Sequence, residues 1–177
     1  MPTVLTHAIV PLALGGALGR NAISPRLLIA GAVAAVLPDV DVVAFKLGIA
    51  YADDFGHRGA SHSLVFAALV GLLGVIAAGS LRCKRPIAGM WLFACTASHP
   101  LLDAFTNGGL GVALWWPWSD ARLFAPWRPL LVSPIGAGFF SGRGLAVLAS
   151  ECRWVLLPTL GLALMIATMR AARARAS

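Results

Sequence analysis

The sequence is short of charge. Only 12% of its 177 residues are Asp, Glu, Lys or Arg, whereas soluble domains carry about 25%. Hydrophobic residues make up 59% of the chain, and so few charges could not cover the surface of a soluble protein of this size. The composition excludes a disordered chain, a coiled coil, a collagen-like fibre and a typical soluble enzyme. It favours a small membrane protein that crosses the bilayer several times.

Cysteine is scarce as well. Cys83, Cys95 and Cys152 show no C-x-x-C spacing, so the sequence offers neither a disulfide framework nor a thiolate zinc site. We expect the three to pack as small buried apolar side chains. The N-terminal segment lacks the basic start of a signal peptide, and we expect it to remain as a first helix.

Acidic residues are few, and the net charge is +7, from 14 Lys and Arg against 7 Asp and Glu. A nucleic-acid-binding protein would gather its basic residues in a patch on a soluble face. Here they stand between apolar runs, as residues that set membrane topology do. We therefore expect no nucleic-acid partner.

Apolar runs occur five times, and a spanning helix needs about 20 mostly apolar residues. The runs cover residues 4–19, 27–45, 64–81, 86–106 and 154–169, the last extending back to about 145. The stretch 107–144 is rich in Gly, Pro and Trp, which predicts a long loop on the membrane surface. The sequence thus predicts an all-α polytopic bundle of about five helices, forming one membrane-embedded domain over residues 1–177.

The basic residues orient this bundle. Eight of the 14 lie in the links 20–26, 82–85 and 170–177, which contain no acid. Five alternating helices place these links on one side, and the positive-inside rule makes that side cytoplasmic. The chain then starts outside and ends inside. All seven acids and all four histidines fall on the outer side, facing the periplasm or the cell exterior.

The depth of the polar residues can be counted from the inner links at about 1.5 Å per helical residue. The count places six of them within about 10 Å of depth, near the outer end of a hydrocarbon core about 30 Å thick. These six are His7, Asp39, Asp41, His62, His99 and Asp103. Four helices can therefore converge at one point near the outer membrane surface.

Four short motifs supply this convergence: T-H at 6–7, P-D-x-D at 38–41, H-R-G-x-S-H-S at 57–63 and H-x-x-x-D at 99–103. An Asp inside a membrane helix costs about 2.5–3.5 kcal/mol, so something must compensate for it. Imidazole nitrogens and carboxylate oxygens both suit Zn²⁺ or Mn²⁺. The predicted metal ligands are His7, Asp39, Asp41, His57, His62, His99 and Asp103.

Spacing indicates how two of the motifs present their side chains. His99 and Asp103 stand four residues apart, so both project from one helix face. Asp39 and Asp41 stand two apart and cannot share a helix face, so we expect the helix to end or break near Pro38. Each carboxylate could then bind one of two ions, or one of the two carboxylates could support a metal ligand without binding an ion itself.

The third motif is a turn. His57 and His62 flank small residues that let the chain fold back, so we expect both imidazoles to point at the same place. Ser61 and Ser63 are predicted to orient these imidazoles by hydrogen bonds. For Arg58 two interpretations stay open: a contact with a ligand or a phosphate, and a solvated side chain.

The segment 114–124 carries three tryptophans, and Trp favours the membrane interface. Within it, Arg122 could pair with an anionic substrate group, because the guanidinium fork matches phosphate oxygens. We predict Arg122 as a catalytic residue on that ground. Asp41 is the second predicted catalytic residue, as a general base in place of ligation.

Together these motifs resemble the YdjM-like family of bacterial inner-membrane metal-dependent hydrolases. The matching pieces, with W-P-W-S-D-x-R as the last, run from residue 6 to about 124 in the family's order. The resemblance implies an inner-membrane location and a hydrolase activity. The family is distantly similar to zinc-dependent phospholipase C and P1 nuclease, all-helical enzymes with trinuclear zinc sites. Because this chain has only four histidines, one to three ions remain open.

The sequence thus predicts a membrane-bound metal-dependent hydrolase that cleaves a phosphoester in a lipid or another amphiphilic substrate, with Zn²⁺ ahead of Mn²⁺ as the cofactor. A transporter or metal-handling membrane protein is the alternative. Its ion path would need polar groups on both sides of the midplane, and the inner halves of these helices are apolar. A third possibility is a structural membrane protein whose acids and histidines only pair with each other.

Overall fold

The computed structural model describes residues 1–134 and 136–176. Ile135, in the predicted 107–144 loop, and Ser177, at the end of the predicted domain, lie outside the described residues. Within them the chain is helical, and β pairing is limited to two isolated bridges. The predicted all-α class is confirmed.

The described residues form five long helical stretches. The first three are α1 (Val4–Leu18), then α2 (Pro25–Val36) continuing through the 3₁₀ helix η1 (Leu37–Val42) into α3 (Val43–Lys46), then α4 (Leu64–Ala77). The last two are α5 (Arg85–Ala104), and α6 (Gly142–Glu151) continuing through the π-helix η4 (Cys152–Leu156) into α7 (Leu157–Ala176). Short 3₁₀ turns form η2 (Ala60–His62) and η3 (Gly136–Phe139).

The last stretch begins at Gly142, close to the predicted extension of this helix back to about residue 145. Two charges interrupt the apolar run over which it extends. Glu151 is fully buried and accepts hydrogen bonds from Thr3 and Thr6 at the start of α1. The guanidinium of Arg153 lies over the ring of Trp154. Both charges are therefore accommodated inside one continuous helix, and the long loop ends earlier than predicted.

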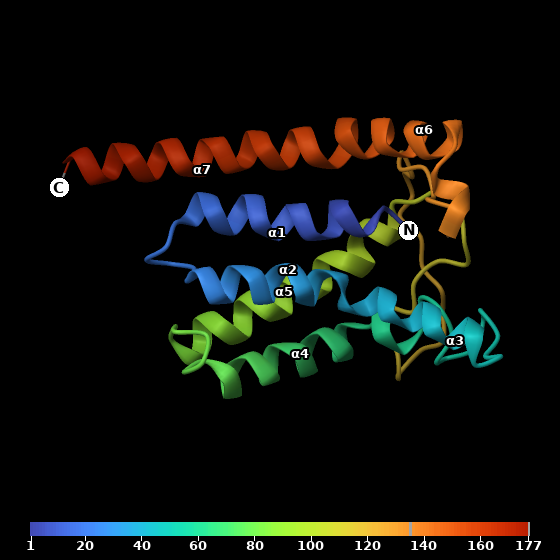
Figure 1. Ribbon diagram of the computed structural model, residues 1–177. Coiled ribbons are helices and arrows are strands. Elements are labelled where there is room, and N and C mark those ends of the chain that lie inside the picture. The colour runs from blue at the N-terminus through green and yellow to red at the C-terminus, as the bar shows by residue number, and fades with distance from the viewer. Residues whose placement is uncertain (135, 177) are drawn as a thin grey trace.

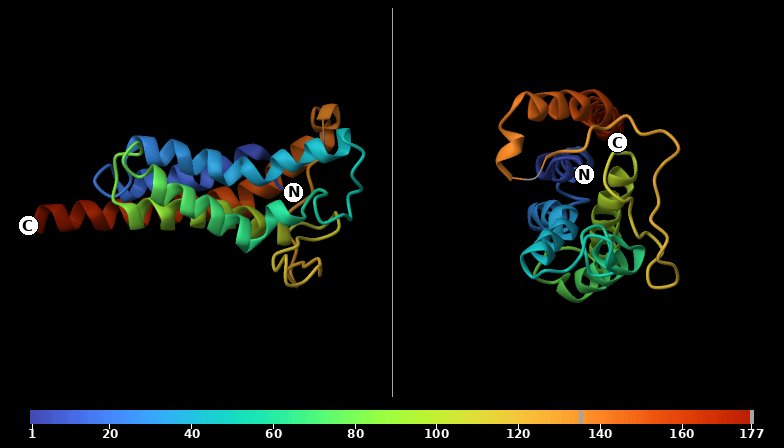
Figure 2. Two further views of the ribbon diagram at one scale, coloured as in Figure 1. Left: turned by 90° about the horizontal axis from the view of Figure 1, so that it is seen from below. Right: turned by 90° about the vertical axis from the view of Figure 1, so that its right-hand side faces the viewer.

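The helices alternate in direction along the bundle (Figure 1). One end, here the loop end, holds the N-terminus and the segments 47–63 and 105–141. The other, here the basic end, holds the links 19–24 and 78–84, and α7 extends past the other helices there (Figure 2). The basic links thus share one end of the bundle, as the alternating arrangement predicted.

The outer surface of the bundle is apolar. Leu69, Leu72, Leu73 and Ile76 of α4 are all more than half exposed, and large contiguous apolar surfaces of this kind mark contact with a membrane or a partner. The stretches 25–46 and 142–176 are long and apolar enough to cross a membrane. Helices α1 and α4 are equally apolar but shorter, so the five-span topology stays a prediction.

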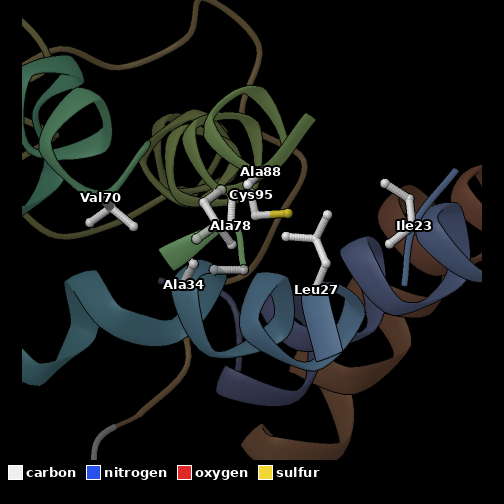
Figure 3. Close-up of a cluster of buried hydrophobic side chains, with 9 residues drawn as sticks. Ile23, Leu27, Ala34, Val70, Ala78, Ala88 and Cys95 are labelled. Carbon is white, nitrogen blue, oxygen red and sulfur yellow. The ribbon is translucent and has the colours of Figure 1, made fainter. Parts of the chain in front are cut away.

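The core lies between α2, α4 and α5 (Figure 3). Its buried side chains are mostly small, and they include Leu27, Ala34, Val70, Ala88 and Cys95. Small residues let helix backbones approach closely, as is usual in membrane bundles.

The expectation for the cysteines holds only for Cys95. Cys83 is half-buried and Cys152 is exposed on the π-helix. The position of a cysteine within an apolar run did not show which face of the helix carries it.

Candidate metal centre

Four buried side chains converge at the loop end: Asp39, His62, His99 and Asp103. Each offers one ligand atom, and these four atoms all lie within 4.8 Å of one another. His99 Nε2 lies 3.2 Å from Asp39 Oδ1, and His62 Nε2 lies 3.5 Å from Asp103 Oδ2. None of the four side chains is more than 5% exposed. The structure thus brings together four of the seven predicted ligands in one group.

The position of Asp39 depends on a break in the second helix. The α-helix ends at Val36, and Pro38 stands at the start of the tighter 3₁₀ helix η1. A 3₁₀ helix turns through three residues, so Asp39 and Asp41 leave the backbone in different directions. Asp39 faces the four-residue group and Asp41 faces the 57–62 turn. The break predicted near Pro38 is confirmed.

Helix α5 supplies two donors from one face. His99 and Asp103 lie one turn apart and both are fully buried. His99 Nδ1 donates a hydrogen bond of 2.7 Å to the carbonyl oxygen of Ala35. A carbonyl can only accept, so the proton of the neutral ring sits on Nδ1. His99 Nε2 then carries the lone pair that faces Asp39.

The 57–63 turn orients His62 so that its Nε2 faces the four-residue group. Arg58 adopts a positive φ of 64°, and a Cβ on Gly59 would collide with the carbonyl oxygen of Asp54, so the turn depends on this glycine. His62 Nδ1 lies 3.0 Å from Ser61 Oγ and 3.1 Å from Asp41 Oδ2. With Nδ1 satisfied on that side, Nε2 is left pointing into the four-residue group.

The electrostatics of His62 follow from its neighbours. Burial lowers the pKa of its imidazole, but hydrogen bonds and charge–charge attraction to Asp103 and Asp41 raise it more, to about 9. Two carboxylates therefore hold a proton on His62 unless another cation takes its place. The site has an excess of negative charge that a divalent ion can satisfy.

Asp41 lies behind the four-residue group. Its carboxylate accepts hydrogen bonds from His57 Nδ1 at 2.6 Å, from Ser61 Oγ at 2.6 Å and from the Arg58 backbone N–H at 3.0 Å. Asp41, His57 and His62 form a second group of possible ligands that shares His62 with the first. In this structure their donor atoms already partner one another, an arrangement that orients the imidazole of a metal ligand from behind.

His7 joins the site from α1. Its ring stacks on that of His99, with centroids 3.7 Å apart and planes 14° from parallel. Its Nε2 lies 3.5 Å from Asp103 Oδ1, and neither ring nitrogen has a hydrogen-bond partner. The structure therefore brings His7 to the edge of the four-residue group, and its ligation stays a prediction.

The strongest indication of a ligand is a set of buried polar atoms without hydrogen-bond partners. Such atoms are rare in native proteins and each calls for an explanation. Both oxygens of Asp39, Oδ1 of Asp103, and Nε2 of both His62 and His99 are in this state, whereas Asp103 Oδ2 has an ion-pair partner in Arg58 Nε at 2.9 Å. The orphaned atoms are the ones that face each other, whereas each outward Nδ1 is bonded. Carboxylate oxygens and imidazole nitrogens are donors that Zn²⁺ accepts, so these residues fit a divalent metal.

Of the two interpretations of Arg58, the structure supports a contact with a predicted metal ligand. It is fully buried, and its Nε lies 2.9 Å from Asp103 Oδ2. Its remaining nitrogens donate to the Gly108 carbonyl and to the Thr106 hydroxyl. The side chain is therefore not solvated, and it holds one Asp103 oxygen in place.

Ser63 and Arg122, two of the predicted site residues, make other contacts in the structure. Ser63 caps α4, since its hydroxyl accepts from the Phe66 N–H and donates to the Ala60 carbonyl, so the predicted contact with an imidazole is wrong. Arg122 donates to the backbone carbonyls of His57, Ala52 and Asp53, which ties the long loop to the histidine turn. Its predicted contact with substrate stays a prediction.

Sequence reasoning missed Glu151. Its carboxylate accepts from the Thr3 N–H at 2.6 Å, from the Thr3 hydroxyl at 2.7 Å and from the Thr6 hydroxyl at 2.6 Å. These bonds hold the start of α1 in place. Thr6, which donates one of them, directly precedes His7. The available signal was a lone acid inside the apolar run over which the last helix was expected to extend.

Comparisons with known proteins identify the family of this chain. The model of the YdjM inner membrane protein family matches residues 1–176. The chain is 50% identical to the inner membrane protein YbcI of Escherichia coli (strain K12), an alignment that covers 89% of this chain and 92% of that protein. No solved structure matches the chain significantly. The chain belongs to the YdjM family of inner membrane proteins.

Proposed function

We propose that this protein is a membrane-bound metal-dependent hydrolase that cleaves a phosphoester in a lipid or another amphiphilic substrate. The observation that supports it most is the set of orphaned donor atoms on Asp39, His62, His99 and Asp103. Burying carboxylate oxygens without hydrogen-bond partners is costly, and a divalent cation would offset that cost. The resemblance of the motifs to metal-dependent hydrolases adds the reaction class.

The donor set favours one Zn²⁺ ion. Two imidazole nitrogens and two carboxylate oxygens supply four ligands, the usual number for zinc. A second ion would have to take Asp41 and His57 away from the hydrogen bond of 2.6 Å that now joins them. Mn²⁺ is the alternative that the oxygen ligands allow.

A bound divalent ion would supply an activated water and would polarise a phosphoryl oxygen. The protein's own residues do the rest. Asp41 and Ser61 hold the His62 ring in its tautomer, and Arg58 holds Asp103. His7 has two free nitrogens beside the ligands, so it can bind a fifth position or carry a proton. Asp41 keeps its predicted role as a general base only if it releases His57.

We place the centre at the outer side of a multi-pass protein, facing the periplasm. Support comes from the basic links, which share the end of the bundle opposite to the metal centre. The exposed Trp115 and Trp118 lie in the long loop at the loop end, where an interfacial belt would be. A site at that level reaches the phosphoester of an amphiphile without extracting it from the membrane.

The test starts with metal content. The protein is purified in detergent without chelator, and zinc, manganese and iron are quantified per chain in the wild type, His62→Ala, Asp103→Ala and Asp120→Ala. Asp120 is an exposed acid of the long loop and serves as the matched control. We expect about one metal ion per chain, lost in the first two variants and kept in the control. Loss of hydrolysis of phospholipids and other lipid phosphoesters in the same two variants completes the assignment.

A wild type without metal, even after zinc or manganese is added back, would overturn the hydrolase proposal. One observation favours the alternative of a metal-handling protein: the four donors are at most 5% exposed, as suits an ion that is held or passed on. Proteoliposomes that move zinc but hydrolyse no phosphoester would decide for that alternative.

A further inference from the structure

Two hollows lie along α1 and η1, and Asp39 of the metal centre lines one of them. The first, of 320 Å³, lies between the start of α1, η1 and the segment 133–139, and Asp39 lines it. The second, of 360 Å³, lies between α1 and α2. Its lining residues are Ala8, Ala32, Val33, Val36, Leu37 and Val40. Each is within the range of about 300–1,000 Å³ that is usual for small-molecule sites.

The two hollows follow the same seam. Leu5 lines the first and Ala8 the second, and residues three apart lie on the same helix face. Across the seam, η1 contributes Asp39 and Val42 to the first hollow and Leu37 and Val40 to the second. From Asp39 back to Ala32 the chain rises about 12 Å along these helices. Together the hollows form one groove, the α1–α2 groove, which runs parallel to the helix axes away from the metal centre.

The groove has one polar end. The second hollow, which is the part of the groove farther from Asp39, has no polar side chain in its lining. At the other end, the Asp39 carboxylate is 5% exposed, and neither of its oxygens has a hydrogen-bond partner. An occupant must therefore be apolar along its length, and a phosphoester at its head can approach the Asp39 carboxylate only through the metal ion that Asp39 would help to hold. Free phosphate and a polar peptide do not have that shape.

We propose that the α1–α2 groove seats one acyl chain of a membrane amphiphile whose headgroup lies at Asp39. The inference rests on the proposed function, since the headgroup would be the phosphoester that the metal centre acts on. Val33 and Val40 are 61% and 58% exposed, so the groove is open along its side. An acyl chain can enter it sideways from the bilayer, parallel to its own direction in the membrane.

The experiment uses photo-crosslinking. The full-length protein is reconstituted in vesicles of phosphatidylethanolamine and phosphatidylglycerol, with a trace of phosphatidylglycerol that carries a diazirine in one acyl chain. After illumination, labelled peptides are quantified by mass spectrometry. The exposed apolar face of α4, with Leu69 and Leu72, reports the background contact with bulk lipid. We expect the α1 and α2 peptides to be labelled about tenfold more, a difference of about 1.4 kcal/mol in occupancy.

Filling the groove should abolish this preference. Ala32→Phe places a ring in the second hollow, and Val33→Trp fills it from the exposed edge, where the fold tolerates bulk more easily. Ala68→Phe adds the same volume on the exposed face of α4 and is the control. We expect the excess labelling to fall to background in the two groove variants and to persist in the control, with metal content unchanged in all three.

The outcomes separate the two proposals. Equal labelling of the seam and of α4 in the wild type, or unchanged labelling in both groove variants that retain metal, would overturn the groove. Specific labelling of the seam in a protein that binds no metal would support the groove and contradict the hydrolase. Hydrolysis that is lost for long-chain phosphoesters but kept for short-chain ones in Val33→Trp would support both.

Discussion

Toward its basic end the bundle buries small apolar side chains, and its helices touch through glycine. At Gly74 an added Cβ would lie 2.9 Å from the Ala88 carbonyl oxygen. At the loop end, three aspartates, four histidines and an arginine come together in one cluster of ion pairs. Close packing stabilises the region toward the basic end. The region at the loop end is stable only when its buried charges are balanced.

This difference separates stability from function. Packing of small residues is short-ranged and indifferent to pH and to metal. A cluster of buried charges with unpaired donors depends on both. We therefore expect changes in one region to leave the other almost untouched, and the following experiments test that separation.

Metal removal should have the largest effect. Chelation leaves the carboxylates of Asp39 and Asp103 buried with orphaned oxygens, and a broken buried pair costs about 3–5 kcal/mol. Hydrogen exchange should rise at η1, η2 and the end of α5, and stay unchanged where α4 meets α5 near the basic end. Uniform exchange along both regions after chelation would contradict the separation.

Asp41→Asn should weaken metal binding without unfolding the protein. The amide keeps the shape but loses the charge that holds His62 and His57, and such partners are worth about 10–100-fold in metal affinity. Competition with a chromogenic zinc chelator measures the change. Ser61→Ala, which removes one neutral contact to Asp41, should give a smaller shift in the same direction. An unchanged affinity in both variants would show that Asp41 does not support the site.

Gly74→Ala tests the packed region. The new methyl group meets backbone and Leu92, so the helices must separate, at a cost of about 1–3 kcal/mol. Thermal unfolding in detergent should show this loss. Gly79→Ala, where nothing lies within 4 Å, is the control. The metal content of the folded Gly74→Ala protein should equal that of the wild type, and a parallel loss of metal would mean that the two regions are coupled.

A decrease in pH should lower the apparent metal affinity gradually. The pKa of His62 is raised to about 9, so in the metal-free protein its imidazole is protonated below that pH, and an incoming metal must displace the proton. Apparent affinity should therefore fall by about tenfold per unit as the pH decreases below 9. Isothermal titration in buffers of different ionisation enthalpy counts the released protons. A flat profile between pH 7 and 9 would exclude His62 as a ligand.

Much of the bundle follows from local patterns. The run 64–81 contains no charge, so its helix was evident, and α4 forms within it. Helix α5 begins at Arg85 and ends at Ala104, close to the predicted 86–106. Alternation of the helices then follows from the short links. The hydrogen-bond partners of Glu151 escaped prediction because one of them, Thr3, lies 148 residues away, and no local pattern contains that information.

The candidate site divides in the same way. The break at Pro38 and the shared face of His99 and Asp103 are properties of a few adjacent residues, so spacing revealed them. Which carboxylate faces the four-residue group and which stands behind His62 depends on how η1 packs against η2. For Arg58 the sequence left a contact at the site and a solvated side chain equally open, and only the packing of the 105–109 segment over it shows its burial.

The carboxylate of Glu151 also bears on how the chain folds. Its partners Thr3 and Thr6 precede it by 148 and 145 residues. Contacts of such high sequence separation slow folding, because the long loop between them must close before they form. The bonds that hold the start of α1, beside His7, can therefore form only after the helix that carries Glu151 has been synthesised.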